Sequence, residues 1–437
     1  MKVSILGLGY VGTVSAACLA ARGHRVTGVD VEPRKVEAIQ QGRAPVIEPG
    51  LDDLIRSVVS SGALTAQTDT ENAVLATDVS LVCVGTPGRP NGALDLTYLT
   101  RVAEQIGRAL ARTSSRHVVT FRSTMIPGTV ESTLVPILEG ASGKRAGRDF
   151  GVAVNPEFLR EGSSLRDFDD PPRIVVGESD DATGATVMSL YDGIQAPRVR
   201  TALRTAEVVK YADNCFHALK IAFANEIGNI CKRSGIDSRK VMEIFCLDTK
   251  LNLSPTYLKP GSAFGGSCLP KDLRALLQHA READLSTPIL AAVLASNEEQ
   301  KRLAFDLVRR TNKKKIGILG MSFKPDTDDL RESPAVELIE ALIGKGYDVA
   351  IYDRNVSMAR LIGANRTYIE KEIPHVSRLL RTTIAEVEEH AEALVVTTRD
   401  PEFADIARRL PADKILIDLV GLLPAGEAPA SYEGICW

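Results

Sequence analysis

The sequence predicts an α/β protein in which two parallel, doubly wound sheets are joined by a long central helix and a helical segment. Three observations predict it: a glycine-rich strand–turn–helix unit opens the chain, residues 205–232 have a helical pattern, and residues 314–353 repeat the plan of the opening unit. We therefore expect a Rossmann-like domain over 1–203, a helical part over 204–300 and a second Rossmann-like domain over 301–437.

Composition and charge limit the class of protein. The 437 residues are 44% hydrophobic, and 53 basic residues against 56 acidic ones give a net charge of -3. Nucleic-acid and anionic-membrane proteins normally carry a basic surplus, so we expect neither partner. The seven cysteines are scattered without a Cys-x-x-Cys pair, and the six histidines form no His-x-x-x-His pair. This pattern is typical of a reduced, cytoplasmic protein without disulfides, and we expect no metal.

The apolar N-terminus (residues 3–20) could be taken for a signal peptide or a membrane span. Gly7, Gly9 and Gly12 disfavour a spanning helix, and the segment divides better into a strand, a turn and a helix. No other stretch approaches the roughly 20 apolar residues that a span needs.

The opening unit has the features of a dinucleotide site. Gly7-x-Gly9-x-x-Gly12 follows the strand VSILG, a small-residue helix runs to about Arg22, and a second strand ends at Asp30. The glycines permit a tight turn, close approach to a pyrophosphate and close helix packing, while a carboxylate at Asp30 suits ribose hydroxyls and repels a 2′-phosphate. We therefore predict NAD rather than NADP. A purely structural strand–turn–helix unit is the alternative.

Polar residues follow three further predicted strands, at 78–87, 116–129 and 150–159. The carboxyl ends of parallel strands form the edge where ligands bind in such sheets. Ordinary turn and cap chemistry is the alternative for each residue. The residues are Thr86, Ser123, Thr124, Glu157 and Glu161.

The central helix carries one polar stripe. At about 100° per residue, Lys210, Asn214, His217 and Asn225 fall within a sector of roughly 80° on an otherwise apolar helix. The stripe faces either a polar ligand or solvent.

One cysteine has an unusual setting, the segment GSAFGGSCLPKD over 261–272. The preceding glycines let the backbone approach a substrate closely, and Pro270 suits the first turn of a following helix. That helix end and Lys271 would favour the nucleophilic thiolate of Cys268, and Asp272 could exchange protons. A small buried apolar cysteine is the alternative.

A second nucleotide-like unit begins at residue 314. A strand ending at Gly320 precedes a helix with Ser333 as its expected N-cap, and the next strand ends in Asp353, much as the earlier one ends in Asp30. The longer loop between them carries Lys324 and Arg331, which could bind phosphates. Because Gly-x-Gly-x-x-Gly is missing, we expect a different nucleotide here.

Together these segments resemble the UDP-glucose/GDP-mannose dehydrogenase family over essentially the whole chain. The segments 343–356 and 373–380 and the sequence EGICW at 433–437 favour GDP-mannose as the substrate, with UDP-glucose as the alternative. The signatures are GLGYVG (7–12), VGTP (84–87), RST-x-x-PGT (122–129), NPEFLREG (155–162), FGGSCLPKD (264–272) and FKPDTDDLRESP (323–334).

The resemblance implies oxidation of a C6 primary alcohol to a carboxylate with two NAD molecules per turnover. Cys268 would capture the intermediate aldehyde as a thiohemiacetal, which a second oxidation converts to a thioester. By matching motif, Lys210 and Asn214 would stabilise the oxyanion. Asp272 and a water near Thr124 would move protons, and Glu161 would assist hydrolysis of the thioester.

The resemblance also implies binding residues and a homodimer built on the helical segment, with exchanged C-terminal parts. A two-electron hydroxyacid dehydrogenase and a non-catalytic nucleotide sensor are the remaining alternatives. The implied NAD-binding residues are Gly7, Gly9, Tyr10, Val11, Gly12, Asp30, Lys35, Thr86, Thr124, Lys271 and Arg331. The implied sugar-nucleotide contacts are Glu161, Lys210, Asn214, His217, Asn225, Tyr257, Lys259, Gly265 and Lys324.

The segment 255–262 (PTYLKPGS) departs from the pattern of GDP-mannose-oxidising members of the family. These carry aromatic residues at the positions of Thr256 and Ser262 and an arginine at the position of Lys259. Because lysine lacks the bidentate fork of arginine, these exchanges change the substrate contacts.

Overall fold

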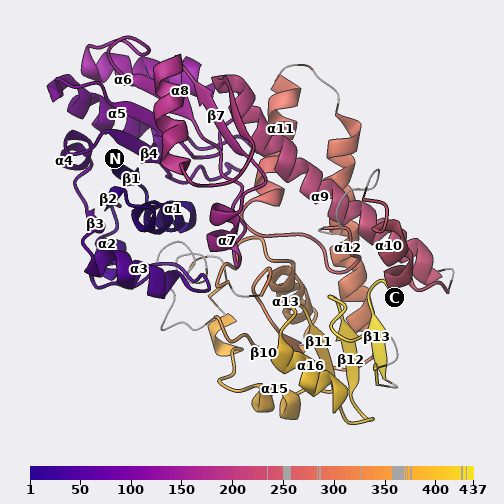
Figure 1. Ribbon diagram of the computed structural model, residues 1–437. Helices are drawn as coiled ribbons and strands as arrows, with labels where there is room; N and C mark the ends of the chain where they lie inside the picture. Colours follow the sequence, from indigo (N-terminus) through magenta and orange to yellow (C-terminus); the bar gives the residue numbers. More distant parts are fainter. Residues whose placement is uncertain are drawn as a thin grey trace. The chain divides into compact units, whose positions relative to one another are not determined.

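The computed structural model describes the chain except residues 234, 250–256, 283, 285–286, 326, 357–368, 370, 372, 375, 425–426 and 430, and the side chains of residues 226, 230, 233 and 377. Thr256, whose exchange the sequence analysis notes, therefore lies outside the described residues. The chain forms two compact units, residues 1–213 and 214–437 (Figure 1).

The first unit is built on an eight-stranded sheet with the order β3-β2-β1-β4-β5-β6-β7-β8. All neighbouring strands are parallel except β6 and β7. Because the chain leaves β1 toward β2 and β3 and then returns to β4, a topological switch point lies between β1 and β4, where such sheets bind ligands. The strands are β1 (Lys2–Leu6), β2 (Arg25–Val29), β3 (Leu64–Gln67), β4 (Val79–Val82), β5 (Val118–Phe121), β6 (Gly151–Val154), β7 (Ile174–Glu178) and β8 (Arg198–Ala202).

Helices cover both faces of this sheet, so its inner strands, such as β4 and β5, are buried on both sides, whereas the edge strand β8 is largely exposed. Val79 and Leu81 of β4 enter the apolar cluster of one face, while Val82 enters that of the other. The predicted strand–turn–helix–strand unit and the three later strands are confirmed. The helices are α1 (Tyr10–Ala21), α2 (Pro33–Gln40), α3 (Leu51–Ser60), α4 (Thr70–Leu75), α5 (Thr97–Arg112), α6 (Val135–Ser142), α7 (Ser164–Asp169) and α8 (Asp181–Met188), with single turns at Val130–Leu134 and Ser189–Tyr191.

The expected long helix is α9 (Leu203–Arg233), which begins in the first unit and continues into the second. The helical segment that follows consists of α10 (Ser238–Phe245), α11 (Leu269–Glu282) and α12 (Pro288–Arg310). The boundary expected at 300/301 falls inside α12, so the chain has no break there.

The second unit holds a parallel five-stranded sheet with the order β10-β9-β11-β12-β13, which confirms the second α/β sheet. Ser333 directly precedes α13 as expected, but its hydroxyl donates to the Met321 carbonyl (2.7 Å) and does not cap the helix. The elements are β9 (Lys315–Leu319), α13 (Pro334–Gly344), β10 (Asp348–Tyr352), the turn Val376–Arg378, α15 (Ile384–His390), β11 (Ala393–Val396), α16 (Pro401–Arg408), β12 (Ile415–Asp418) and β13 (Tyr432–Gly434).

The two sheets repeat one local geometry. Asp30 follows β2 and accepts a hydrogen bond from the Leu8 backbone (2.7 Å), while Asp353 follows β10 and accepts one from the Met321 backbone (2.7 Å). In each unit the carboxylate fixes the turn that follows the first strand of that unit, β1 or β9, so the parallel seen in the sequence is a structural one.

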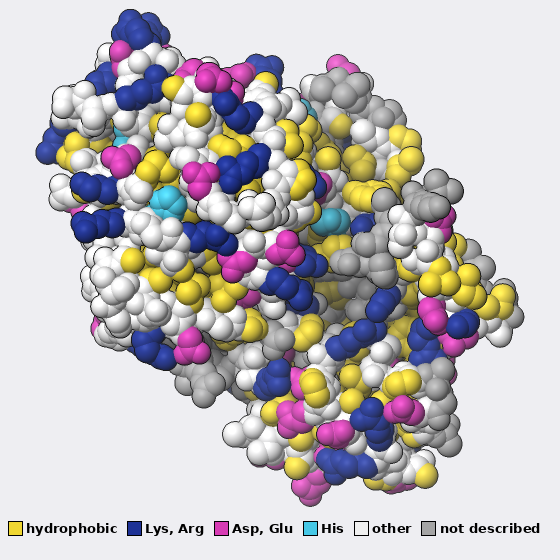
Figure 2. Space-filling model, in the orientation of Figure 1, with side chains coloured by type: hydrophobic (Ala, Val, Ile, Leu, Met, Phe, Trp, Pro, Cys, Tyr) yellow, Lys and Arg dark blue, Asp and Glu magenta, His cyan; other side chains and the backbone are white. Residues whose placement is uncertain are grey.

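The surface of the protein carries mixed charge. Figure 2 shows basic and acidic side chains interspersed over the face in view. None of the described helices combines the length and apolar composition needed to cross a bilayer. Across the described residues, no three His, Cys, Asp or Glu side chains cluster as metal ligands would.

A buried histidine should make the first unit sensitive to acid. The His117 imidazole lies between the Thr77 carbonyl (3.0 Å) and the Ser80 hydroxyl (2.8 Å), and burial lowers its pKa to about 4. As the pH falls below 6.5, the unfolded chain binds a proton that the folded chain does not, and the folded state loses stability. Between pH 7.5 and 5.0 we expect His117 to account for a loss of about 2 kcal/mol in the free energy of unfolding, absent in His117→Gln. Urea unfolding at both pH values measures it, and equal losses in the two proteins would contradict the neutral buried imidazole.

Candidate active site

The glycine-rich turn after β1 forms an open cradle. A Cβ atom at Gly12 would lie 1.8 Å from the Gly7 carbonyl oxygen, so that position requires glycine. At Gly9, by contrast, the described atoms leave open space around the Cβ position. In the described part of the chain no side chain caps α1, whose first N–H groups are therefore available to an anion.

The carboxylate of Asp30 lies at the end of β2, beside this turn. It is buried and accepts hydrogen bonds from the backbone of Leu8 (2.7 Å) and Glu32 (2.9 Å) and from the Lys35 ammonium (3.0 Å). Lys35, expected only as a cofactor contact, thus also holds the acidic residue.

A buried carboxylate that the sequence analysis missed joins two predicted segments. Glu48 accepts hydrogen bonds from the Tyr10 hydroxyl and from the backbone N–H groups of Gly162 (2.7 Å) and Ser164 (2.7 Å). Burial and the hydrogen bond to Glu48 raise the pKa of the Tyr10 phenol. The pair therefore anchors the loop that carries Glu161 to the glycine-rich turn. Because Glu48 is a single acidic residue in a loop, no periodic pattern in the sequence indicates its role.

The loops after β4 and β5 are tied together at the carboxyl edge of the sheet. The Thr86 hydroxyl donates to the Thr124 carbonyl (2.8 Å), and the Ser123 hydroxyl donates to the Val84 carbonyl (2.6 Å). Thr86 and Thr124 therefore lie in contact, and the hydroxyls of Thr86 and Ser123 hold the turns that follow β4 and β5.

An ion pair lies buried at the end of β6. The Lys210 ammonium of α9 is 2.8 Å from the Glu157 carboxylate, and both side chains are 8% exposed. Glu157 also accepts the Leu159 backbone N–H (2.7 Å), so the anion is held from two sides. The sequence marked both residues but gave no reason to pair them.

In the second unit, Cys268 lies directly before α11, and Pro270 is in the first turn of that helix, as predicted. The Cys268 side chain is exposed, so it is not the small buried apolar cysteine of the alternative interpretation. Its carbonyl accepts the Asp272 N–H (2.9 Å). The Asp272 carboxylate is 1% exposed, accepts a hydrogen bond from the Asn214 amide and lies 2.9 Å from the Lys271 ammonium.

The polar stripe of α9 is satisfied by the protein itself. Besides the pairs of Lys210 and Asn214, Asn225 is buried and accepts the Gly261 backbone N–H (2.8 Å). His217 stacks on Tyr257, with ring centroids 4.7 Å apart. The solvated stripe is therefore wrong for Lys210, Asn214 and Asn225. Asn225 and His217 contact the segment before Cys268, whereas Asn214 contacts the first turn of α11.

Two glycines before the cysteine have a role that the sequence analysis did not foresee. A Cβ atom at Gly265 would lie 2.3 Å from the Glu332 carbonyl oxygen, and one at Gly266 would lie 2.8 Å from the Phe323 ring. These glycines therefore let the loop lie against Glu332 and Phe323, in addition to any approach to a substrate.

The two basic residues expected near phosphates are in the same part of the second unit. The Lys324 ammonium lies 5.3 Å from the centroid of the Phe323 ring, and Arg331 forms an ion pair with Asp329 (2.6 Å). Lys259, the third basic residue of the predicted substrate set, is exposed.

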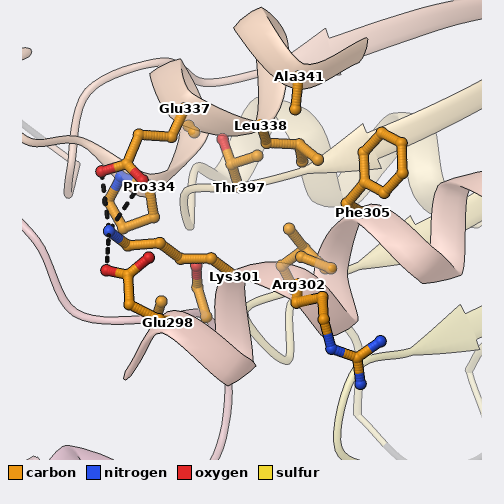
Figure 3. Close-up of a pocket in the computed structure, with 14 residues that line it drawn as sticks. Glu298, Lys301, Arg302, Phe305, Pro334, Glu337, Leu338, Ala341 and Thr397 are labelled. Carbon is orange, nitrogen blue, oxygen red and sulfur yellow. Dashed lines mark hydrogen bonds and ion pairs between the residues drawn. The ribbon is translucent and has the colours of Figure 1, made fainter. Parts of the chain in front are cut away.

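Beside the cysteine loop, a cavity of about 310 Å³ lies between α12 and α13. Figure 3 shows the Lys301 ammonium between the carboxylates of Glu298 and Glu337, at 2.8 Å from each, with Phe305 farther along the cavity. Burial opposes the charge of Lys301, but the two carboxylates outweigh it and raise its pKa. Ser262 belongs to the wall of this cavity, so its small side chain leaves room there.

Comparison with known proteins decides the family. Residues 1–195 match the NAD binding domain of the UDP-glucose/GDP-mannose dehydrogenase family, residues 204–299 its central domain and residues 317–425 its UDP binding domain. The chain belongs to this family. The resemblance read from the motifs is thereby confirmed, and so are a dehydrogenase fold and NAD as the cofactor.

Three relatives place the chain within the family. It is 51% identical to GDP-mannose 6-dehydrogenase from Pseudomonas putida over 100% of both chains. The structure of GDP-mannose dehydrogenase from Pseudomonas aeruginosa is 51% identical, covers 100% of both chains and gives a TM-score of 0.58. The structure of a UDP-glucose dehydrogenase from Pyrobaculum islandicum is 38% identical, covers 100% of this chain and 98% of that chain, and gives a TM-score of 0.90.

The glycine-rich cradle permits a matched test of NAD binding. In Gly9→Ala the new methyl group enters open space, so we expect an unchanged melting temperature but at least tenfold weaker NAD binding. In Gly12→Ala the methyl group collides with the Gly7 carbonyl, so we expect the fold itself to be destabilised. Calorimetric titration with NAD and thermal unfolding measure both effects. Unchanged NAD affinity in a folded Gly9→Ala protein would contradict the cradle as the cofactor site.

Proposed function

We propose that the protein oxidises GDP-mannose at C6 to GDP-mannuronate, the precursor of alginate, with two NAD molecules per turnover. The observation that carries this proposal is the position of Cys268, an exposed thiol at the start of α11. A reaction of two electrons needs no such group, whereas an oxidation of four electrons needs a means to hold the aldehyde between its two steps.

The proposed reaction proceeds through two sulfur adducts. NAD, when bound, would supply the hydride acceptor for both oxidations. In the first, the C6 alcohol loses a hydride and its hydroxyl proton to give the aldehyde. The Cys268 sulfur adds to the carbonyl carbon of the aldehyde formed first, giving a thiohemiacetal. Loss of a hydride from that carbon and of the hydroxyl proton gives a thioester. Water then cleaves the carbon–sulfur bond, releases the carboxylate and restores the thiol.

Five polar residues would support these steps. Lys210, fixed by Glu157, and Asn214, fixed by Asp272, would donate to the oxyanion of the adduct. Asp272 and a water at Thr124 would carry protons, and Glu161 would assist attack of water on the thioester. The anchoring of both donors supports these roles, because a donor that is already oriented needs no reorganisation during the reaction.

Binding of the two ligands is assigned to different parts of the chain. We propose that residues 1–203 bind NAD, that residues 204–300 form the helical part, and that residues 301–437 bind the nucleotide of the substrate. For NAD, the proposed residues are Gly7, Gly9, Tyr10, Val11, Gly12, Asp30, Lys35, Thr86, Thr124, Lys271 and Arg331. For the sugar nucleotide, they are Glu161, Lys210, Asn214, His217, Asn225, Tyr257, Lys259, Gly265 and Lys324.

The choice of GDP-mannose over UDP-glucose is supported by the relatives. The identity is 51% to GDP-mannose 6-dehydrogenase over the full length, against 38% to the UDP-glucose dehydrogenase structure. Ser262, which replaces an aromatic residue of the GDP-mannose pattern, lies in the wall of the cavity between α12 and α13 and is not one of the proposed catalytic groups.

We also propose that the enzyme acts in the cytoplasm as a homodimer, with exchange of C-terminal parts. Large apolar side chains on the helical part of the second unit are exposed, among them Phe216, Phe223, Ile244 and Leu247. A second copy of the chain would cover such side chains.

The electron count tests the reaction. With NAD in excess and a limiting amount of GDP-mannose, we expect two NADH per GDP-mannose, measured by absorbance, with GDP-mannuronate as the product in mass spectrometry. One NADH per substrate would overturn the four-electron scheme. Faster turnover of UDP-glucose in parallel assays would overturn the choice of substrate.

Removal of the thiol tests its role. In Cys268→Ala we expect kcat to fall on the order of 10⁴-fold, because the nucleophile is lost. Cys246→Ala is the matched control, since Cys246 is a partly exposed cysteine of the same unit, and it should keep normal turnover. Normal activity in Cys268→Ala, or free aldehyde in place of a Cys268 adduct in the quenched wild-type enzyme, would refute the mechanism.

A further inference from the structure

The segment that leads to Cys268 is held by side chains rather than by regular secondary structure. Residues 261–264 lie between α10 and α11 in neither a helix nor a strand, yet Gly261, Ala263 and Phe264 are buried. Buried backbone N–H and C=O groups need partners, and a segment without a helix or a strand must find them elsewhere.

Asn297 of α12 supplies two of these partners to one residue. Its amide oxygen accepts the Phe264 N–H at 2.8 Å, and its amide nitrogen donates to the Phe264 carbonyl at 2.8 Å. Asn297 is 4% exposed. A single side chain thus pairs with Phe264 as a neighbouring strand would, four residues before the cysteine.

Gln300, one turn further along α12, holds the start of the segment. Its amide nitrogen donates to the Gly261 carbonyl (2.5 Å), and its oxygen accepts the Asn229 amide (2.9 Å). The Gly261 N–H is bound by Asn225. Both backbone groups of Gly261 and both of Phe264 are therefore paired with buried amides.

We propose that Asn297 and Gln300 are positioning residues that place the Cys268 loop for reaction. On the near side they fix Gly261 and Phe264, and on the far side the Asp272 N–H is bonded to the Cys268 carbonyl in the first turn of α11. Between these points the Gly266 N–H donates to the Glu332 carbonyl at 3.2 Å. Gly265 and Gly266 tolerate many backbone conformations, so the amides at Gly261 and Phe264 set the direction in which the stretch approaches Cys268. The inference rests on Cys268 as the proposed nucleophile.

A purely structural role for these amides makes different predictions. If they only satisfied buried groups, their loss would lower the melting temperature and leave the folded enzyme unchanged in kcat. If they place the thiol, their loss changes the reactivity of Cys268 in the folded protein, because a displacement of about 1 Å can cost about 10²-fold in rate.

The experiment compares Asn297→Ala, the milder Asn297→Ser and Gln300→Ala with wild type. Hydrogen exchange of the peptide that contains residues 261–268 reports the loop, and mass spectrometry reports the rate at which iodoacetamide alkylates Cys268. We expect at least tenfold faster exchange at Phe264 in the Asn297 variants and at least fivefold slower alkylation at pH 7. In turnover we expect kcat to fall by about 10²-fold with KM changed less than threefold.

Two matched controls isolate the effect. Gln278→Ala removes an amide of the same type from α11, where its side-chain hydrogen bonds in the described structure are to Glu282 and Arg281. Glu299→Ala alters the exposed side of α12 between the two positions. Both should match wild type in exchange, alkylation and kcat.

The outcomes separate this inference from the proposed function. Exchange and alkylation do not need turnover, so they test the loop even if GDP-mannose is not oxidised. Wild-type exchange and alkylation in folded Asn297→Ser and Gln300→Ala proteins would overturn the positioning role. Alkylation of Cys268 could be altered in the Asn297 and Gln300 variants while Cys268→Ala still oxidises GDP-mannose normally. That combination would support the positioning role and refute only the proposed function of the thiol.

Discussion

The structure depends on the rule that a polar side chain removed from water must find a partner inside the protein. On the long helix α9 this rule acts on one face, where Lys210, Asn214 and Asn225 are all buried. Each finds its partner in a segment that carries proposed catalytic or binding groups: Lys210 in the loop after β6, Asn214 in the first turn of α11, and Asn225 in the loop before Cys268. The helix core thus fixes the positions of reactive loops that have little regular structure of their own.

Both sheets use the same device, a carboxylate that binds a neighbouring turn. Asp30 directly follows β2, Asp353 directly follows β10, and each binds the turn after the neighbouring strand, β1 or β9. In the first unit this turn leaves open space at Gly9, as a dinucleotide site requires. In the second unit a longer segment follows the first strand, and its residues Phe323, Glu332 and Pro334 lie against the cysteine loop. The same strand–turn–helix arrangement therefore forms an open turn in the first unit and a support for the cysteine loop in the second. The length of the loop after the first strand distinguishes the two.

Much of this organisation could be predicted from the sequence, because strands, glycine turns and long helices have local signals. The strand–turn–helix unit around Gly7, the helix α9 and the place of Cys268 before α11 all follow from spacing and propensity. The partners of the polar residues could not be predicted: Glu157 lies 53 positions from Lys210, and Glu48 lies 114 positions from Gly162. Such pairs are set by tertiary packing, which leaves no periodic trace in the chain. Ser333 is a further case. Its position before α13 was predictable, but its hydroxyl donates to the Met321 carbonyl, 12 positions earlier, and does not cap the helix.

The backbone strain at Tyr257 has a practical consequence. Its backbone has φ of 66°, in the left-handed region that glycine tolerates and an aromatic residue does not favour, and its ring stacks on His217. Glycine would relieve the strain and remove the ring in one step. Selection for heat resistance would thus favour Tyr257→Gly, at a residue proposed to contact substrate. The most heat-resistant variants would then be poor catalysts. At this residue, a gain in heat resistance would come with a loss of catalytic activity.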